Sequence, residues 1–147
     1  MQYFSGAAPT ASHVLKLDPG DDVLQAVREF VTAARIRTGV VVSGIGTLDH
    51  CRMHMVTTTD YPPVEVFPTW EDEALELVEM QGVIADGVPH IHMTVSDQHS
   101  AVSGHLEEGC RILYLGEIVI LELGGHDLTR VPNEHGIPQL AEKSSQA

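Results

Sequence analysis

Three histidines form the part of the sequence best suited to chemistry. His90 and His92 stand two residues apart in the segment 89–97, and His105 follows 13 residues after His92. Side chains alternate between the two faces of a strand, so His90 and His92 would point the same way if this segment is a strand. Neutral imidazoles that converge from two neighbouring strands predict a site for a zinc-like divalent cation. A fourth coordination position would be left for water or a small ligand.

The alternative interpretation is that His90 and His92 lie on a strand face that is exposed to water and binds no ligand. Ile91 and Met93 alternate with the histidines and are expected to be buried, which favours a ligand site. Such a site could polarise a carbonyl group, generate hydroxide, or merely hold a fold or an oligomer together. His50 and His54 share a face of another expected strand and could join a polar pocket. The histidines in loop-like segments are expected at the surface: His99, His126 and His135.

The composition indicates a single acidic domain. The 147 residues include 21 Asp and Glu but only 8 Lys and Arg, which gives a net charge of -13. This length fits one domain with its own core, and 43% hydrophobic residues are typical of a globular chain. Proteins that bind nucleic acid directly usually carry a basic stripe, and we find none. Direct binding to nucleic acid or to anionic lipid is therefore not expected.

The chain contains no run of 18 apolar residues, and its first residues, 1–6, lack the basic and apolar parts of a signal peptide. We therefore expect a cytoplasmic protein without a membrane span. In that compartment the two cysteines, Cys51 and Cys110, are expected to be reduced and simply buried.

The apolar periodicity predicts an α+β fold. Apolar residues recur at helical spacing over 21–36, and this segment is expected to be one amphipathic helix. Strands are expected at 13–17, 39–45, 48–57, 74–84, in the two segments that carry the histidines, and at 111–123, where a buried helix is the alternative. The proline-containing segment 60–70 is expected to be a loop. One helix with about six or seven following strands predicts a mostly antiparallel sheet covered on one face by that helix.

Several motifs, taken together and in order, resemble the plant and prokaryote conserved (PPC) domain family, in its prokaryotic stand-alone type. The resemblance extends from about residue 13 to residue 140, which is nearly the whole chain. It is carried by the segments Leu17–Asp22, Val42–Gly46, Pro89–His92, Gly104–Leu106, Glu117–Ile120 and Gly136–Leu140. A domain over residues 12–141 is expected on this basis, between a flexible N-terminus (1–11) and a flexible tail (142–147).

The resemblance implies a central antiparallel sheet and a homotrimer. It also implies that His90, His92 and His105 hold a divalent metal, and the chemistry of the donors makes zinc the expected ion. The family usually has two glycines before the third histidine, and here Ser103 replaces the first of them. Glu117 matches a recurrent glutamate of the family and is a candidate for supporting a ligand or for catalysis, with a buried structural carboxylate as the alternative. Plant members add an Arg-Gly-Arg-Pro element that enters DNA, and this sequence contains none.

A trimer would also account for the length of the apolar segment 111–123. Part of this segment is expected to line the subunit interface, together with other exposed apolar side chains. The candidates for that role are Met53, Met55 and Tyr114.

Three functions are compatible with these observations. The first is a cytosolic homotrimer that binds a divalent metal and holds a small molecule in a pocket at the metal. The second is a zinc-dependent lyase or hydrolase acting on a small oxo acid or ester, in which Glu117 or Glu107 would move protons. The His-x-His pattern is similar at the level of fold to acetolactate decarboxylase, although that similarity carries no activity over. The third is a regulatory module that associates with DNA through partners.

Overall fold

The structure, a computed structural model, describes residues 1–143, which contain one helix and nine strands. Six of the strands form the main sheet in the order β1-β7-β2-β4-β5-β6, and β3 is added to the far end of β2. All pairings are antiparallel, and β8 and β9 form a separate two-stranded sheet. The bounds are β1 (Pro9–Leu17), α1 (Val23–Ala33), β2 (Thr38–Val56), β3 (Glu65–Val66), β4 (Thr69–Ala85), β5 (Val88–Ser96), β6 (Ala101–Leu106), β7 (Arg111–Leu123), β8 (Leu128–Pro132) and β9 (Pro138–Glu142).

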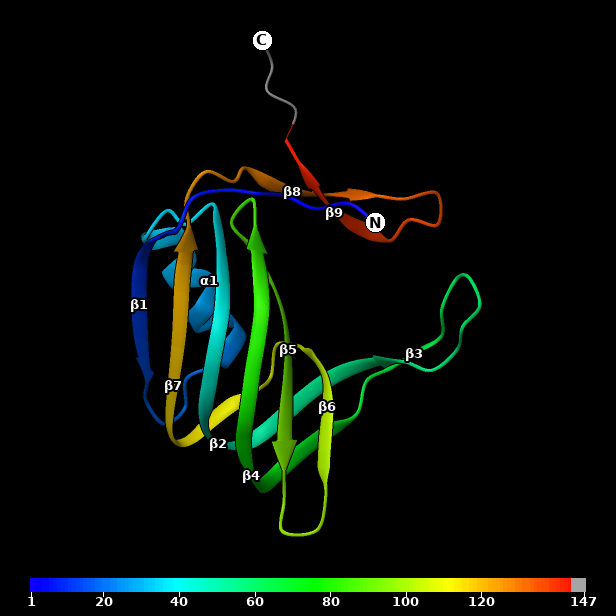
Figure 1. Ribbon diagram of the computed structural model, residues 1–147. Coiled ribbons are helices and arrows are strands. Elements are labelled where there is room, and N and C mark those ends of the chain that lie inside the picture. The colour runs from blue at the N-terminus through cyan, green and yellow to red at the C-terminus, as the bar shows by residue number, and fades with distance from the viewer. Residues whose placement is uncertain (144–147) are drawn as a thin grey trace.

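The helix covers one face of the main sheet and leaves the other face open, which confirms the predicted α+β fold (Figure 1). The Asp22 side chain accepts a hydrogen bond from the backbone N–H of Gln25 at 2.9 Å and so caps the first turn of α1. The apolar stripe of α1 packs into the core through Val23, Leu24, Val27 and Val31. Burial of each such side chain contributes about 1.5–3 kcal/mol, so the helix is held mainly by its contact with the sheet.

Strand β2 is one continuous strand where two strands, 39–45 and 48–57, were expected. The pairing of β2 with β7 shifts register between Gly46 and Leu48, and this irregularity interrupts the apolar alternation. A Cβ atom at Gly46 would overlap the carbonyl oxygen of Leu115. The glycine therefore permits a close approach of two strands and does not end a strand.

Other boundaries also differ from the expectation. Strand β1 begins at Pro9, four residues before the expected start. The strand expected at 111–123 is confirmed as β7, which lies between β1 and β2, and the alternative of a buried helix is excluded. The proline-containing segment includes the short strand β3, and β4 already begins at Thr69. The β8–β9 hairpin was not expected. The limits of the domain remain a prediction, and residues 144–147 of the expected flexible tail lie outside the described residues.

The core lies between α1 and the sheet. It contains alternate residues of the strands, including Ile91, Met93 and Val95 of β5. Met53 is fully buried in this core, so the expectation that it lines a subunit interface was wrong, whereas Tyr114 is exposed. Cys51 and Cys110 are free and buried, with their sulfur atoms 4.0 Å apart. Within the described residues, no helix is long and apolar enough to cross a membrane.

Gly82 on β4 fixes the distance between β4 and β5 beside His90. A Cβ atom at this position would overlap the carbonyl oxygen of His90. We therefore expect Gly82→Ala to push β5 away and to lower the free energy of unfolding by about 1–3 kcal/mol. Urea denaturation measures this change. Gln81→Ala is the matched control, because Gln81 is the exposed neighbour on the same strand and its loss is expected to cost less than about 0.5 kcal/mol. Equal stability of the two variants would contradict the prediction.

Candidate metal centre

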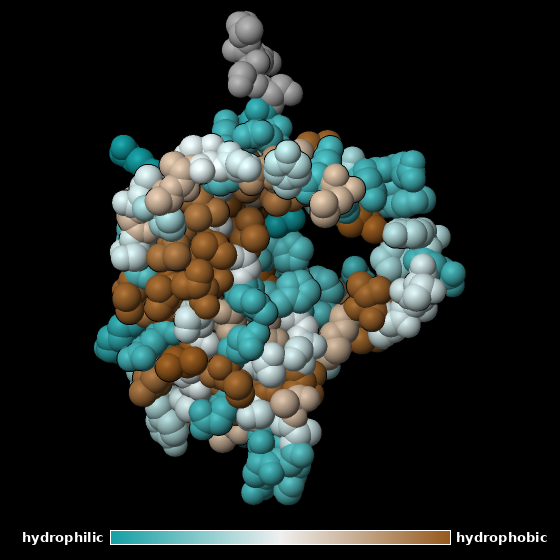
Figure 2. Space-filling model, in the orientation of Figure 1, coloured by the Kyte–Doolittle hydropathy of each residue, from teal (hydrophilic) through white to brown (hydrophobic). Residues whose placement is uncertain are grey.

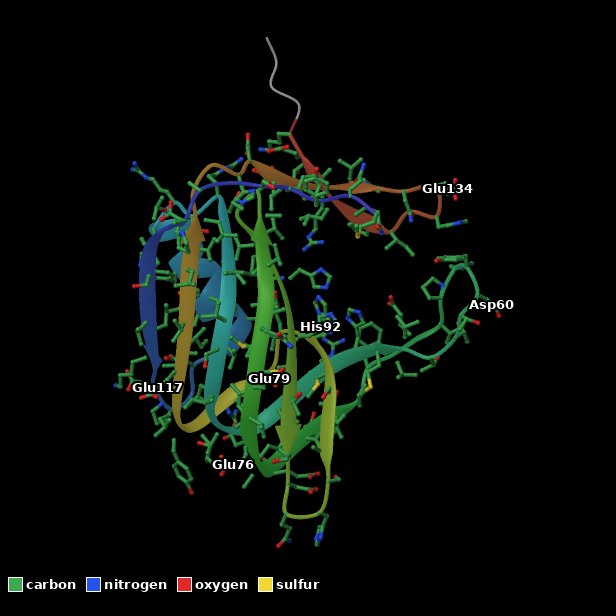
Figure 3. The ribbon with its side chains drawn as sticks, viewed as in Figure 1. Asp60, Glu76, Glu79, His92, Glu117 and Glu134 are labelled. Carbon is green, nitrogen blue, oxygen red and sulfur yellow. The ribbon has the colours of Figure 1, made fainter. Side chains whose placement is uncertain are left out.

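A row of imidazoles crosses three neighbouring strands on the open face of the sheet. His92 of β5 is paired with His105 of β6, and His105 is in turn paired with His54 of β2. His90 lies two residues before His92 and therefore on the same face, while Ile91 and Met93 are buried on the other side. The predicted convergence of three histidines from two strands is thus found in the structure. In Figure 3, His92 lies in a group of nitrogen-bearing side chains below the β8–β9 hairpin.

The spacing of His90 and His92 suits a shared cation. The Nε2 atoms of His90 and His92 are 3.3 Å apart. Zinc binds imidazole nitrogens at about 2.0–2.1 Å in a tetrahedral arrangement, which places two ligand nitrogens about 3.3–3.4 Å from each other. The ring of His105 is centred 4.8 Å from that of His90 and 5.5 Å from that of His92. The pair on β5 therefore has the separation of two ligands of one metal ion, with His105 beside it.

The surroundings keep these imidazoles neutral, which is the form that binds a metal. Partial burial, followed by the positive charge of Arg130 and the neighbouring imidazoles, lowers the pKa of His90 to about 4. Burial followed by the influence of His54 lowers the pKa of His92, the most exposed of the three. The same two causes lower the pKa of His105, against an opposing effect of Glu107. At neutral pH the ring nitrogens are therefore available as ligands without the loss of a proton.

Glu107 and His54 complete the cluster, and sequence reasoning did not place them there together. The Oε1 atom of Glu107 lies 2.6 Å from Nδ1 of His54 and 3.5 Å from Nδ1 of His105. Among residues 1–143, the set of three His, Cys, Asp or Glu residues whose donor atoms all lie within 4.8 Å of one another is His54, His105 and Glu107. The period-two spacing of His50 and His54 was visible in the sequence, but the pairing of β2 with β6 was not.

Glu117 is not part of this centre. It lies on β7, which is separated from β5 by β2 and β4, and its side chain is exposed. Figure 3 shows it at the far side of the sheet from His92. The structure therefore does not bring Glu117 to the histidines, either as a support for a ligand or as a catalytic carboxylate.

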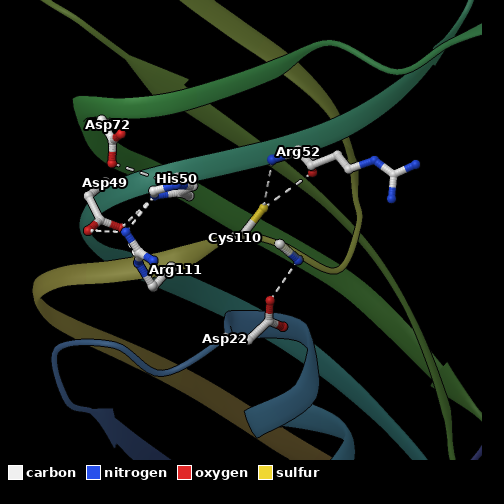
Figure 4. A network of polar contacts seen from close by, with 8 residues as sticks. Asp22, Asp49, His50, Arg52, Asp72, Cys110 and Arg111 are labelled. Atoms are coloured by element: carbon white, nitrogen blue, oxygen red, sulfur yellow. Dashed lines mark hydrogen bonds and ion pairs between the residues drawn. The ribbon is translucent and has the colours of Figure 1, made fainter.

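His50 belongs to a different polar network, at the bend of β2 (Figure 4). Its Nδ1 atom accepts a hydrogen bond from Arg111 at 2.7 Å, and Arg111 makes two hydrogen bonds of 2.8 Å to Asp49. The pairing with Arg111 lowers the pKa of Asp49. His50 and His54 therefore serve separate sites. Three other histidines were expected at the surface. His99 and His135 are exposed, and His126 is half-buried.

The sequence profile of the Plants and Prokaryotes Conserved (PCC) domain matches residues 4–124. The chain belongs to this family. A stretch of the bifunctional protein GlmU from Synechococcus sp. (strain JA-3-3Ab) is 29% identical over 130 residues, which cover 85% of this chain and 20% of that protein. The PCC chain thus spans about a fifth of the length of the curated relatives it matches.

Solved structures share the PCC fold over nearly the whole chain. A metal-containing protein from Archaeoglobus fulgidus has a TM-score of 0.80 and 22% identity, with 97% of this chain and 100% of that chain covered. A plant- and prokaryote-conserved (PPC) protein from Pyrococcus horikoshii has a TM-score of 0.79 and 22% identity, with 97% and 99% covered. At these identities the likeness concerns the fold alone.

The low pKa of His90 makes the stability of the metal-free protein depend on pH. His90 titrates near 6.5 in the unfolded chain and near 4 in the folded protein, so the unfolded chain binds more protons between these values. We expect the free energy of unfolding to decrease as the pH falls from about 6.5 to about 4, and His90→Gln to reduce this slope. Urea denaturation at a series of pH values measures this slope in the parent and in the variant. His99→Gln, in the exposed turn after β5, is the control, and the same slope in parent and His90→Gln would contradict the prediction.

Proposed function

We propose that this PCC-domain protein binds a divalent metal ion, zinc by the chemistry of its donors, through His90, His92 and His105. The observation that carries the proposal is the 3.3 Å separation of the Nε2 atoms of His90 and His92. Two neutral imidazoles at this separation either share one proton or share one cation, and a third imidazole beside them favours the cation. The metal-containing neighbour from Archaeoglobus fulgidus has the same fold, which agrees with the proposal.

Glu107 and His54 are assigned to the support of the centre. A histidine that binds a metal through one ring nitrogen usually directs its other N–H to a carboxylate. The Nδ1 atom of His105 is buried and makes no hydrogen bond among the described residues, and Glu107 is the carboxylate nearest to it at 3.5 Å. In this arrangement Nε2 of His105 would be the nitrogen left to bind the metal, while the 2.6 Å contact with His54 holds the carboxylate in place.

The donor set also indicates what the centre can do. Three imidazoles leave a fourth position of a zinc ion open to water or to a small molecule. A metal held in this way supplies a Lewis acid that polarises an oxygen atom of a ligand. The chain's own contribution is to present three neutral ligands and one half-buried carboxylate on a rigid sheet. A small molecule that binds at the centre is part of the proposal, and turnover of an oxo acid or ester is its enzymatic form.

We further propose that the protein is a cytoplasmic homotrimer that assembles through the open face of the sheet. The free, buried cysteines agree with a reducing compartment. Figure 2 shows a hydrophobic area over β1, β7 and β2 on this face. Val14 on the edge strand β1 is 74% exposed, and Val42 and Ile45 on the interior strand β2 are about half exposed, which is unusual for apolar side chains inside a sheet. A second copy that covers this area would remove these side chains from water.

Metal content distinguishes a metal centre from a purely structural group of histidines. We expect the purified parent protein to hold about one zinc ion per chain after dialysis, and the His90→Ala, His92→Ala double variant to hold none. Elemental analysis gives the content, and circular dichroism shows that the variant is folded. His99→Ala is the matched control, because it removes an exposed histidine from the neighbouring turn. A parent without metal after zinc has been supplied would refute the proposed function.

The assembly is tested independently of the metal. Ile45→Glu places a charge in the middle of the open face, and we expect it to convert a trimer into monomers because a buried carboxylate without a partner is costly. Light scattering measures the mass in solution. Val88→Glu is the control, because Val88 is at least as exposed as Ile45 but lies beside the turn between β4 and β5. A monomeric parent protein, or a trimer that persists in Ile45→Glu, would contradict the proposed interface.

A further inference from the structure

Arg130 lies on β8, in the hairpin that crosses the end of the main sheet above the histidines (Figures 1 and 3). The hairpin is fixed to the sheet beside this residue. Leu128 is 5% exposed, and its backbone N–H donates a hydrogen bond of 3.3 Å to the buried hydroxyl of Thr38. The position of Arg130 is therefore set by the fold and not by a loose segment of chain.

The side chain of Arg130 is half-buried, and its Nε atom is buried without a hydrogen-bond partner among the described residues. The hairpin that carries it lies above the histidines (Figure 3), and after burial the charge of Arg130 is the next cause that lowers the pKa of His90, which agrees with a place near the metal centre. Burial lowers the pKa of Arg130 itself, but a guanidinium remains protonated in any protein at neutral pH. A positive charge thus stands beside a group of neutral imidazoles.

A missing counter-ion is unexpected in a chain with 21 acidic and only 8 basic residues. Five of the basic side chains form ion pairs with carboxylates within the described residues, namely Lys16, Arg28, Arg37, Arg111 and Lys143. Of the other three, Arg35 and Arg52 are exposed to water. Arg130 is the basic residue that is partly removed from water and yet has no carboxylate beside it in residues 1–143.

We infer that Arg130 binds the carboxylate of a small acid whose neighbouring oxygen occupies the open position of the metal. This inference rests on the proposed metal site and names the class of ligand for it. A guanidinium presents its N–H donors in a planar fork that matches the two oxygens of a carboxylate. A partly desolvated charge without a partner is unfavourable, and an anionic ligand removes that cost. The imidazole ligands are neutral, so the metal and Arg130 together attract an anion into an otherwise acidic protein.

The test uses cobalt(II)-loaded protein and glycolate, which carries a carboxylate next to a hydroxyl group. Binding of glycolate is measured by the change that it causes in the visible spectrum of cobalt. Ethylene glycol serves as the comparison ligand without a carboxylate. We expect the parent to bind glycolate, and Arg130→Met to bind it at least about tenfold more weakly. Arg130→Lys keeps the charge but loses the fork, and an intermediate affinity is expected. Arg35→Met is the matched control because Arg35 is exposed, and it is expected to bind like the parent.

Elemental analysis of every variant separates the possible failures. If the parent holds no metal, the proposed function is wrong and the role of Arg130 falls with it. If all variants hold metal but Arg130→Met binds glycolate as tightly as the parent, the metal site stands and the role of Arg130 is refuted. Binding of inorganic phosphate in place of glycolate, or binding of glycolate and ethylene glycol with equal affinity, would overturn the assignment of a carboxylate ligand.

Discussion

Strand β6 is paired along both of its edges, and the position of the metal centre depends on this double pairing. One edge sets His105 opposite His92 of β5, and the other sets it opposite His54 of β2. A slip of one residue in either pairing would turn the imidazoles of one strand toward the core. Gly104 contributes to the close fit, because a Cβ atom there would lie 3.0 Å from the carbonyl oxygen of His54 and 3.1 Å from Cβ of Met53. The register of three strands is thus the physical basis of the site.

The charge of the protein makes the centre more specific. With a net charge of -13, the surface as a whole repels anions, including nucleic acid. Most of the basic side chains are neutralised by nearby carboxylates, whereas the half-buried Arg130 has none beside it among the described residues. Lowered pKa values keep His90, His92 and His105 from adding positive charge in the absence of a metal. The centre can therefore gain positive charge when a metal binds and then accept an anion that the rest of the surface would exclude.

Much of the fold followed from local pattern. The helix, strand β7 and the two strands that carry the histidines were predicted because their periodicity agrees with their burial. The continuity of β2 was missed because its irregular pairing with β7 interrupts the alternation. The β8–β9 hairpin was missed because its strands are short and half-exposed, so they lack an apolar pattern.

The sequence predicted only those features of the site that depend on spacing within a single strand. The shared face of His90 and His92 follows from their spacing alone. The contacts of His54 with Glu107 join residues 53 positions apart in the sequence, and they exist because β6 is inserted between β5 and the end of β2. Glu117 shows the opposite error, since a residue that matched a family pattern lies on a strand remote from the histidines. Spacing within a strand is a local property, whereas a cluster across strands depends on the order of the sheet.

The division of the sheet into a covered and an open face links the metal centre to the proposed assembly. Pairing across β4 places His92 and Val42 on the same face, with Gln81 between them, because Val41 is opposite Gly82 and Gly82 is opposite Ile91. Since α1 occupies the other face, a second copy has only the open face on which to bury apolar strand residues. The imidazoles of the metal centre and the exposed apolar residues of the proposed interface therefore lie on the same face of the sheet. Of these apolar residues, Val42 lies nearest to the metal centre, because only Gln81 of β4 stands between it and His92. An assembly that covers Val42 would border the centre on that side and restrict its access to small molecules, which agrees with a ligand no larger than a simple acid.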